Sequence, residues 1–321
     1  MTFGSGQRVG EENVLIRNGN CCVRVLPKLG GKIASIRIAD QELLQAPLSP
    51  PLPRTHSMAF DEGDASGWDE CVPSVAACTV ATKSGAAEVP DHGDLWRVPW
   101  QVVEQREDAV TMRAACFSLP LELLRVATLR ESQRGWRFQL DYTITNRGAE
   151  RVPWSWGAHP LFTVEPGDHI ELPESIVSLR LEGSGGKRLG EGGATVAWPM
   201  ARLADGATTD LRRVQPASSG IGDKLFAGPL AARDGWCVLN RPSVGLRIRV
   251  NFDETKTPYL GLWICYGGWP DRPGPKQNCV ALEPATAPVD SLAQGGSWSR
   301  TLDPGASYSW TMAVEFERME R

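Results

Sequence analysis

The feature that most restricts the fold of this chain is a strict alternation of apolar and polar residues in several short segments. From Trp136 to Ile144 every second residue is apolar, and the residues between them are polar or charged. The same period of two occurs over residues 246–252 and 307–316. Successive side chains of a β-strand point to opposite faces, so this period predicts strands with one buried face. Half-buried strands of this kind are typical of antiparallel sheets.

Weaker patterns complete an all-β interpretation. They predict further strands over residues 14–17, 22–26, 32–38, 110–117 and 259–266. Helical periodicity is nearly absent: Leu119–Arg130 could form a helix, but Pro120 and the neighbouring predicted strands argue against it. Many short strands joined by Gly/Pro turns predict a sandwich or a barrel.

The chain gives no sign of a division into domains. The Gly-rich stretch from Leu181 to Gly193 interrupts the strand patterns, but they resume on both sides of it. We therefore expect a surface loop there, not a linker, and a single domain over residues 1–321. Single all-β domains of more than 200 residues are common.

Composition and charge exclude several classes of protein. With 41% apolar and 22% charged residues the chain is not expected to be disordered. Its net charge of −4 argues against binding to nucleic acid or to an anionic membrane. No apolar run approaches the roughly 18 residues of a membrane span. Met1–Asn13 has no apolar stretch typical of a signal peptide, and the eight cysteines show no C-x-x-C spacing. We expect a cytoplasmic protein with reduced thiols.

The usual motifs of nucleotide and hydrolase chemistry are missing. The sequence contains no G-x-G-x-x-G, no P-loop, no G-x-S-x-G and no closely spaced pair among its four histidines. Nucleotide binding, serine hydrolysis and metalloprotease chemistry are therefore disfavoured, and we expect no cofactor and no metal. Only a metal site assembled from distant residues stays open.

Three short segments instead place a titratable residue among glycines, prolines and apolar residues. They are residues 90–100 with His92, residues 154–162 with His159, and residues 279–290 with Glu283. Burial among such neighbours shifts the pKa of a histidine or glutamate toward the range that acid–base catalysis at neutral pH requires.

Each segment also has a structural interpretation. A single histidine in a β-protein is more often a hydrogen-bonded core or turn residue than a catalytic one. Glu283 precedes Pro284 and could simply leave the sheet into solvent. The 12 tryptophans are suited to stacking on sugar rings, but most tryptophans of a sandwich belong to its core.

Taken together and in order, these segments resemble the galactose mutarotase-like superfamily, which includes aldose 1-epimerases and hexose-6-phosphate mutarotases. The resemblance also includes residues 29–36, 67–74, 222–226 and 259–263, and it extends from about residue 14 to residue 317. It implies a single large antiparallel β-sandwich with a sugar site on its concave face.

The resemblance also implies roles for individual residues. Glu283 corresponds to the general base, His159 to the general acid, His92 to a second histidine on the substrate, and Asp223 to a sugar-binding aspartate. We therefore expect these four side chains to lie in one cleft.

The chain departs from the superfamily in two places. No arginine occurs between Arg54 and His92, where galactose mutarotases carry one for the sugar. Trp96 stands where hexose-6-phosphate mutarotases have an arginine, and Arg97 follows one position later, which on a strand would face the other way. Trp68 or Trp96 is therefore expected on the wall of the cleft, stacked on a neutral sugar, and Arg97 is a weaker candidate for substrate binding.

These observations predict an aldose 1-epimerase-like isomerase of carbohydrate metabolism that interconverts the α and β anomers of a free sugar. The alternatives are a non-catalytic carbohydrate-binding protein of the same fold, a sugar-phosphate mutarotase, and epimerisation at another carbon. The expected partner is a small-molecule carbohydrate, and the expected state is a monomer or a homodimer.

Overall fold

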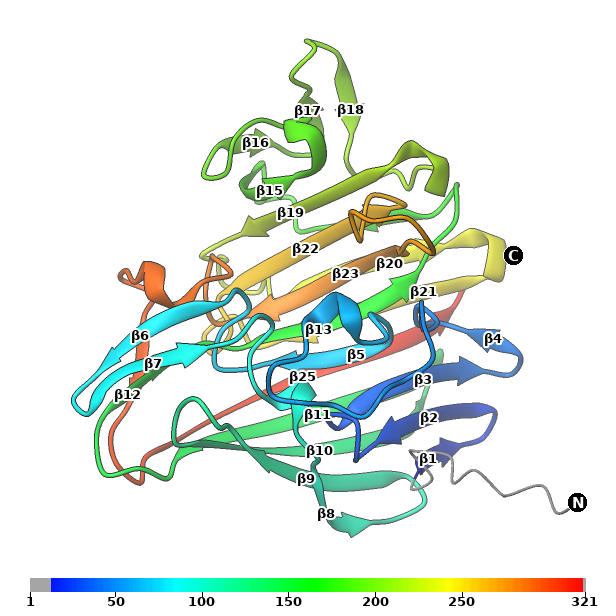
Figure 1. Cartoon of the computed structure of the whole chain (residues 1–321). Coiled ribbons are helices and arrows are strands. Elements are labelled where there is room, and N and C mark those ends of the chain that lie inside the picture. The colour runs from blue at the N-terminus through cyan, green and yellow to red at the C-terminus, as the bar shows by residue number, and fades with distance from the viewer. Residues whose placement is uncertain (1–12, 320–321) are drawn as a thin grey trace, which may run out of the picture.

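The structure, a computed structural model, describes residues 13–319 and consists of two antiparallel sheets packed face to face (Figure 1). The larger sheet has eleven strands in this part of the chain. In spatial order they are β1 (Val14–Asn18), β2 (Cys21–Leu26), β3 (Lys32–Ile38), β5 (Trp68–Cys71), β13 (Gly157–Thr163), β23 (Asn278–Ala285), β22 (Tyr259–Tyr266), β19 (Ile221–Ala227), β15 (Ser178–Ser184) and β16 (Thr195–Ala197), while β4 (Gln41–Glu42) pairs with β3.

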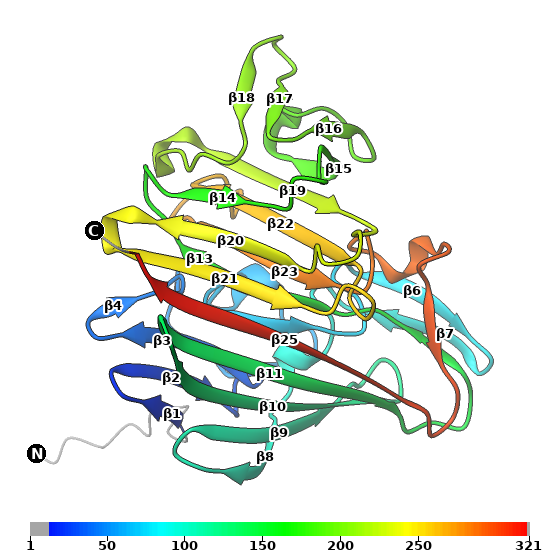
Figure 2. The ribbon, with the colours of Figure 1, turned by 180° about the vertical axis from the view of Figure 1, so that it is seen from behind.

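The second sheet has eight strands and forms the layer that faces the viewer in Figure 2. In spatial order they are β14 (His169–Glu171), β20 (Trp236–Arg241), β21 (Leu246–Phe252), β25 (Ser307–Arg318), β11 (Gly135–Asn146), β10 (Leu121–Ser132), β9 (Ala109–Ala115) and β8 (Gln101–Gln105). Burial alternates along β10, β11 and β21, with the apolar residues turned toward the larger sheet. The predicted antiparallel β-sandwich is therefore confirmed.

Short strand pairs and 3₁₀ turns lie outside the two sheets. Three short strand pairs are β6 (Cys78–Thr82) with β7 (Gly85–Val89), β12 (Val152–Trp154) with β24 (Arg300–Leu302), and β17 (Met200–Arg202) with β18 (Thr208–Asp210). The 3₁₀ turns are η1 (Phe60–Glu62), η2 (Leu95–Arg97), η3 (Gly185–Lys187), η4 (Ala217–Ser219), η5 (Pro242–Val244) and η6 (Leu292–Gln294). Within residues 13–319 no helix is long and apolar enough to cross a membrane.

Two segments show where the sequence patterns were ambiguous. The stretch that could have formed a helix is strand β10, which pairs along its whole length with β11. The stretch expected to be a loop after Leu181 begins as strand: β15 continues to Ser184, with an irregular register between Leu181 and Gly183, before η3 turns the chain. Pairing with β19 supplies there the backbone hydrogen bonds that a Gly-rich sequence does not predict.

The hydrophobic core lies between the two sheets. One continuous cluster of buried residues includes side chains from Val14 to Phe316. Trp68 of the larger sheet contacts Phe138 of the smaller sheet edge to face, with 6.3 Å between ring centroids. This packing buries the apolar face of both sheets and leaves the opposite face of the larger sheet free to carry a site.

A single carboxylate links the two sheets through this core. Glu70 of β5 accepts hydrogen bonds from Arg125 of β10 (3.0 Å) and from the hydroxyl of Tyr142 of β11 (2.8 Å). Its second oxygen accepts one from the indole of Trp156 (2.9 Å). All four side chains are almost completely buried. Burial raises the pKa of Glu70, and the Arg125 guanidinium opposes that shift.

We expect replacement of Arg125 to be strongly destabilising. Arg125→Met would leave the carboxylate of Glu70 buried without its counter-charge, which typically costs about 3–5 kcal/mol of unfolding free energy. Urea unfolding would measure this loss. The double variant Arg125→Met/Glu70→Leu, which removes both charges, should recover much of it; a single variant as stable as the wild type would contradict this role.

Candidate active site

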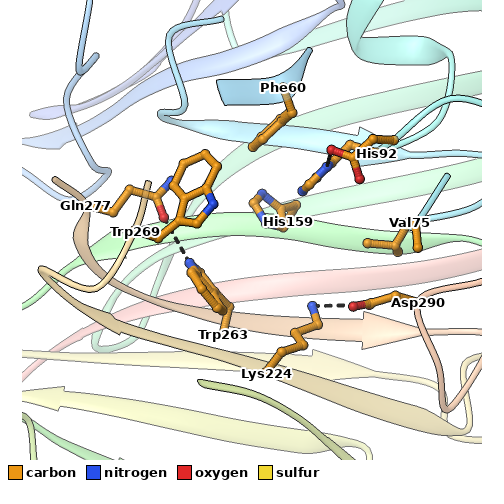
Figure 3. Close-up of a pocket in the computed structure, with 11 residues that line it drawn as sticks. Phe60, Val75, His92, His159, Lys224, Trp263, Trp269, Gln277 and Asp290 are labelled. Carbon is orange, nitrogen blue, oxygen red and sulfur yellow. Dashed lines mark hydrogen bonds and ion pairs between the residues drawn. The ribbon is translucent and has the colours of Figure 1, made fainter. Parts of the chain in front are cut away.

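A cavity of about 260 Å³ lies on the face of the larger sheet that is turned away from the smaller sheet (Figure 3). It is lined by Phe60, Val75, Ala76, Asp91, His92, His159, Lys224, Trp263, Trp269, Gln277 and Asp290. Strands β13, β19 and β22 form its floor, and the loops around residues 60, 75, 92, 269 and 290 form its rim. All three segments singled out in the sequence therefore contribute to one cavity, through His92, His159 and Asp290.

Glu283 lies next to this cavity, buried in strand β23. Its Oε1 atom is 3.7 Å from Nε2 of His159 on the neighbouring strand β13. Glu283 is only 3% exposed and lies inside the strand, so it does not leave the sheet into solvent. Glu283 Oε1 and His159 Nδ1 are both buried without a hydrogen-bond partner. Burying such atoms without a partner is costly, so each is available for a hydrogen bond with a ligand.

Lys224 of β19 provides the counter-charge of Glu283. Its ammonium group donates to Glu283 Oε2 and lies 3.7 Å from Oδ1 of Asp290. Burial opposes the charge of this lysine, but Asp290 and Glu283 outweigh that effect and raise its pKa above the usual value. Burial raises the pKa of Glu283, and Lys224 opposes this shift only in part. The site therefore holds a fixed cation beside a carboxylate of enhanced basicity.

His159 is held in its neutral form. Burial, followed by electrostatic interactions with His92 and Lys224, lowers the pKa of His159 well below the usual value. The carboxylate of Glu283 would favour an imidazolium, but its charge is already paired with Lys224. At neutral pH His159 is thus a neutral imidazole with one N–H to donate.

His92 lies in the loop between β7 and η2, opposite His159. Its Nδ1 is 2.8 Å from Oδ2 of Asp91, its ring stacks on Phe60 with 3.7 Å between centroids, and its ring centroid is 5.2 Å from that of His159. The hydrogen bond from His92 lowers the pKa of Asp91 although burial alone would raise it. The backbone of His92 has a φ of 58°, a strained conformation for a residue other than glycine.

Arg97 holds this strained loop from behind. Its guanidinium donates to the carbonyl oxygens of Asp91 and Gly93 on either side of His92, and to that of Met58. Arg97 is buried and stacks on the ring of Trp96, 4.2 Å from its centroid. Neither residue lines the cavity, so the expected contacts of Trp96 and Arg97 with a sugar are not found; both support the loop that carries His92.

The expected sugar-binding role of Asp223 is also corrected by its position. Asp223 points to the opposite face of β19, where it binds Ser184 (2.7 Å) and Arg188. Its neighbour Lys224 faces the cavity, because successive residues of a strand alternate between faces. A shift of one position thus decides which of the two residues faces the cavity.

The same alternation removes Trp68 from the cavity wall. Trp68 is fully buried between the two sheets, so the expected stacking of Trp68 on a sugar is wrong for this arrangement. The aromatic walls are Trp263, Trp269 and Phe60. Trp263 is fixed by a hydrogen bond from its indole to Gln277 Oε1 (2.9 Å), drawn in Figure 3.

Some of these wall residues could have been found in the sequence. Trp263 lies in a segment that carried the family resemblance, and Asp290 ends the segment that contains Glu283. Phe60, in η1, and the loop residues Trp269 and Gln277 lie in stretches without a distinctive sequence pattern. Within residues 13–319, no three His, Cys, Asp or Glu side chains are grouped as they would be around a metal ion.

Comparison with known proteins supports the fold. The family model of aldose 1-epimerases matches residues 79–191. No curated protein matches the chain in sequence. Three solved structures illustrate the likeness. The Slr1438 protein of Synechocystis sp. PCC 6803 has a TM-score of 0.71 at 18% identity, covering 99% of this chain and 100% of its own.

Two further structures come from lactobacilli. A galactose mutarotase related enzyme of Lactobacillus acidophilus has a TM-score of 0.65 at 14% identity, covering 96% of this chain and 100% of its own. A galactose mutarotase-like protein of Lactobacillus casei has a TM-score of 0.64 at 18% identity, covering 95% and 100%. Identities this low establish the fold alone. The chain therefore has the galactose mutarotase-like fold, and the resemblance to this superfamily expected from its motifs is confirmed.

Proposed function

We propose that this protein is an aldose 1-epimerase-like isomerase that interconverts the α and β anomers of a free sugar. The observation that carries the proposal is the buried carboxylate of Glu283, 3.7 Å from His159 at the edge of a small polar and aromatic cavity. Its volume of about 260 Å³ is close to the lower end of ligand pockets, which suits a monosaccharide.

Anomer exchange requires one base and one acid. The base removes the proton of the anomeric hydroxyl, the C1 carbonyl forms, and the bond from C1 to the ring oxygen breaks while the acid protonates that oxygen. Rotation about the C1–C2 bond and the reverse proton transfers give the other anomer and restore both groups. Each positioned group contributes typically about 10²–10⁴-fold.

Glu283 is suited to the role of base. Its raised pKa makes it more basic than an exposed carboxylate, and Lys224 stabilises the ionised form in which it can accept a proton. Its free oxygen, Oε1, faces His159, a residue of the cavity wall. A histidine of the cavity then serves as the acid.

The charges around the cavity favour a sugar without a phosphate group. The carboxylates of Asp91 and Asp290 line the space and that of Glu283 lies beside it, whereas no arginine is among the lining residues of the described chain. Lys224 is already engaged by two of these carboxylates. The indoles of Trp263 and Trp269 offer apolar faces to a sugar ring.

One observation favours the alternative of a carbohydrate-binding protein without activity. Glu283 is not itself a lining residue, and both of the groups that it contacts, His159 and Lys224, are. If the carboxylate stays behind them in the complex, the cavity would bind a sugar without opening its ring.

The first test separates these functions. We expect the purified protein to accelerate anomer exchange of at least one free aldose without added metal or nucleotide, measured by polarimetry or NMR exchange at the anomeric proton. Aldose phosphates serve as the comparison and should exchange more slowly on the protein. Binding across a broad sugar panel without faster exchange would replace the enzyme by the binding protein.

The second test concerns the base. Glu283→Gln keeps the shape of the side chain but removes its basicity, so the exchange rate should fall by about 10²-fold or more. The affinity for the sugar should change much less, because the base is needed mainly in the transition state. Rate and affinity are measured side by side. Wild-type turnover in the variant would remove Glu283 from the mechanism.

The third test uses the pH profile of kcat/KM. Glu283 acts only when ionised, so activity should fall as the pH drops through its raised pKa. Lys224→Met removes the charge that opposes this shift, and the acidic limb should therefore move to higher pH. Lys224→Arg keeps the charge and is the matched control. An acidic limb that is equally placed in both variants would show that Lys224 does not tune the base.

A further inference from the structure

One end of the cavity is acidic and the other is aromatic. In Figure 3 Asp290 lies to one side of His159 and Trp269 lies to the other. We propose that the acidic end binds a protonated amino group of the sugar, so that the preferred substrates are 2-amino-2-deoxyaldoses. This inference rests on the proposed function, because it names the substrate class of the same site.

Asp290 is a carboxylate without a cation of its own. Its ion-pair partner in the described part of the chain is Lys224, 3.7 Å from Oδ1, but this ammonium donates its hydrogen bond to Glu283 instead. Oδ1 of Asp290 is buried and accepts no hydrogen bond from residues 13–319. The side chain is 18% exposed and lines the cavity, so a ligand can reach it. A hydrogen-bond donor on the ligand would supply the missing partner.

The neighbouring carboxylates favour a cation over a neutral hydroxyl at this position. Burial raises the pKa of Asp290, the negative charges of Glu182 and Asp91 add to this shift, and Lys224 opposes it. Lys224 must also balance Glu283. A positive charge on the ligand would reduce the repulsion among these groups, and a charge-assisted hydrogen bond is roughly twice as strong as a neutral one.

The other basic groups near this end already have partners. Arg180 pairs with Glu182. Arg97 lies behind Asp91 and donates to backbone carbonyl oxygens, among them that of Asp91 itself. Nδ1 of His92 is 2.8 Å from Oδ2 of Asp91. None of these contacts satisfies Oδ1 of Asp290, so the position stays open for an ammonium group of the ligand.

Lys224 also indicates which carbon carries the amino group. Its ammonium contacts Glu283, the proposed base, and Asp290 at once, so a single ammonium group separates the two carboxylates. If Glu283 takes the proton of the hydroxyl on C1, the group at Asp290 belongs to a neighbouring carbon. C2 is the carbon bonded to C1, whereas C6 lies across the ring. The geometry therefore favours an amino group on C2.

The aromatic end offers no comparable partner for an amine. Trp263 and Trp269 present indole rings there, which suit the apolar face of the sugar ring. The amide of Gln277 is used on both sides: its oxygen accepts from Trp263 (2.9 Å), and its nitrogen donates to the carbonyl oxygen of Ala65 (3.1 Å). The two ends thus orient an amino sugar in one direction.

The first experiment measures binding without turnover. A 1,5-anhydro sugar has no anomeric hydroxyl and cannot open its ring, so its affinity reports recognition alone. At about pH 7, where an amine of this kind is largely protonated, the 2-amino compound should bind about tenfold more tightly than its 2-hydroxyl counterpart. The N-acetyl derivative carries no charge and should lose this advantage. Calorimetry with the gluco and galacto configurations measures all three affinities.

Asp290→Asn is the matching variant. It keeps the shape of the side chain and the main-chain oxygen that accepts hydrogen bonds from Val75 and Ala76, so it should fold. Affinity for the 2-amino compound should fall about tenfold, and affinity for the 2-hydroxyl compound should change much less. Glu182→Gln removes a nearby charge that does not line the cavity, and it should keep the preference. Circular dichroism checks each fold; the N-acetyl comparison decides if Asp290→Asn does not fold.

Equal affinities for the amino and hydroxyl compounds, or a preference that survives in Asp290→Asn, would overturn the inference. Anomer exchange of the free sugars is measured separately. Faster exchange of neutral aldoses without a preference for the amine would reject the amino-sugar assignment and leave the proposed function in place. Amine-dependent binding without faster exchange of any sugar would reject the proposed function and keep ammonium recognition at Asp290, so the two failures are distinguishable.

Discussion

The whole molecule depends on the alternation of side chains along the strands of the larger sheet. Because neighbouring residues face opposite sides, each central strand serves the inter-sheet core and the site at once. On β5, Glu70 reaches the smaller sheet through Arg125, whereas Asp69 points to the other face and pairs with Lys32 (2.5 Å). On β23, Leu282 belongs to the core and Glu283 to the site. The backbone of the site is thus also the backbone of the core.

Several charged side chains are buried in and near the cavity. Lys224 lies between two carboxylates in the cavity, and a second buried cluster joins Lys32 to Asp64 and Asp69 nearby. Buried ion pairs of this kind add little net stability compared with an apolar core. Their value lies in fixed electrostatics: positive charges, including that of Lys32, contribute to keeping His159 neutral. A site built from paired charges can hold its titratable groups in defined protonation states before a ligand binds.

Much of the fold could be predicted from the sequence, because an apolar residue at every second position reflects the alternation of buried and exposed side chains along a strand. The strands at 32–38, 246–252 and 259–266 have the bounds that the pattern indicated. The candidate site was predicted less completely. His92, His159 and Glu283 do come together, but Asp223 and Trp68 face away from the cavity. Alternation shows that two neighbours face opposite sides without saying which side holds the site. Loop residues such as Trp269 have no periodic pattern at all.

The balance of charge in the cavity connects its two histidines to the kind of molecule that it can accept. Since carboxylates outnumber lysine there, a proton on one histidine reduces the excess negative charge, whereas a phosphate would increase it. A proton on both histidines would instead bring two like charges together across 5.2 Å. The charges of the cavity therefore favour an uncharged ligand over an anionic one. Under the proposed function, a neutral sugar meets Glu283 and a histidine of the cavity without adding a charge that must be buried.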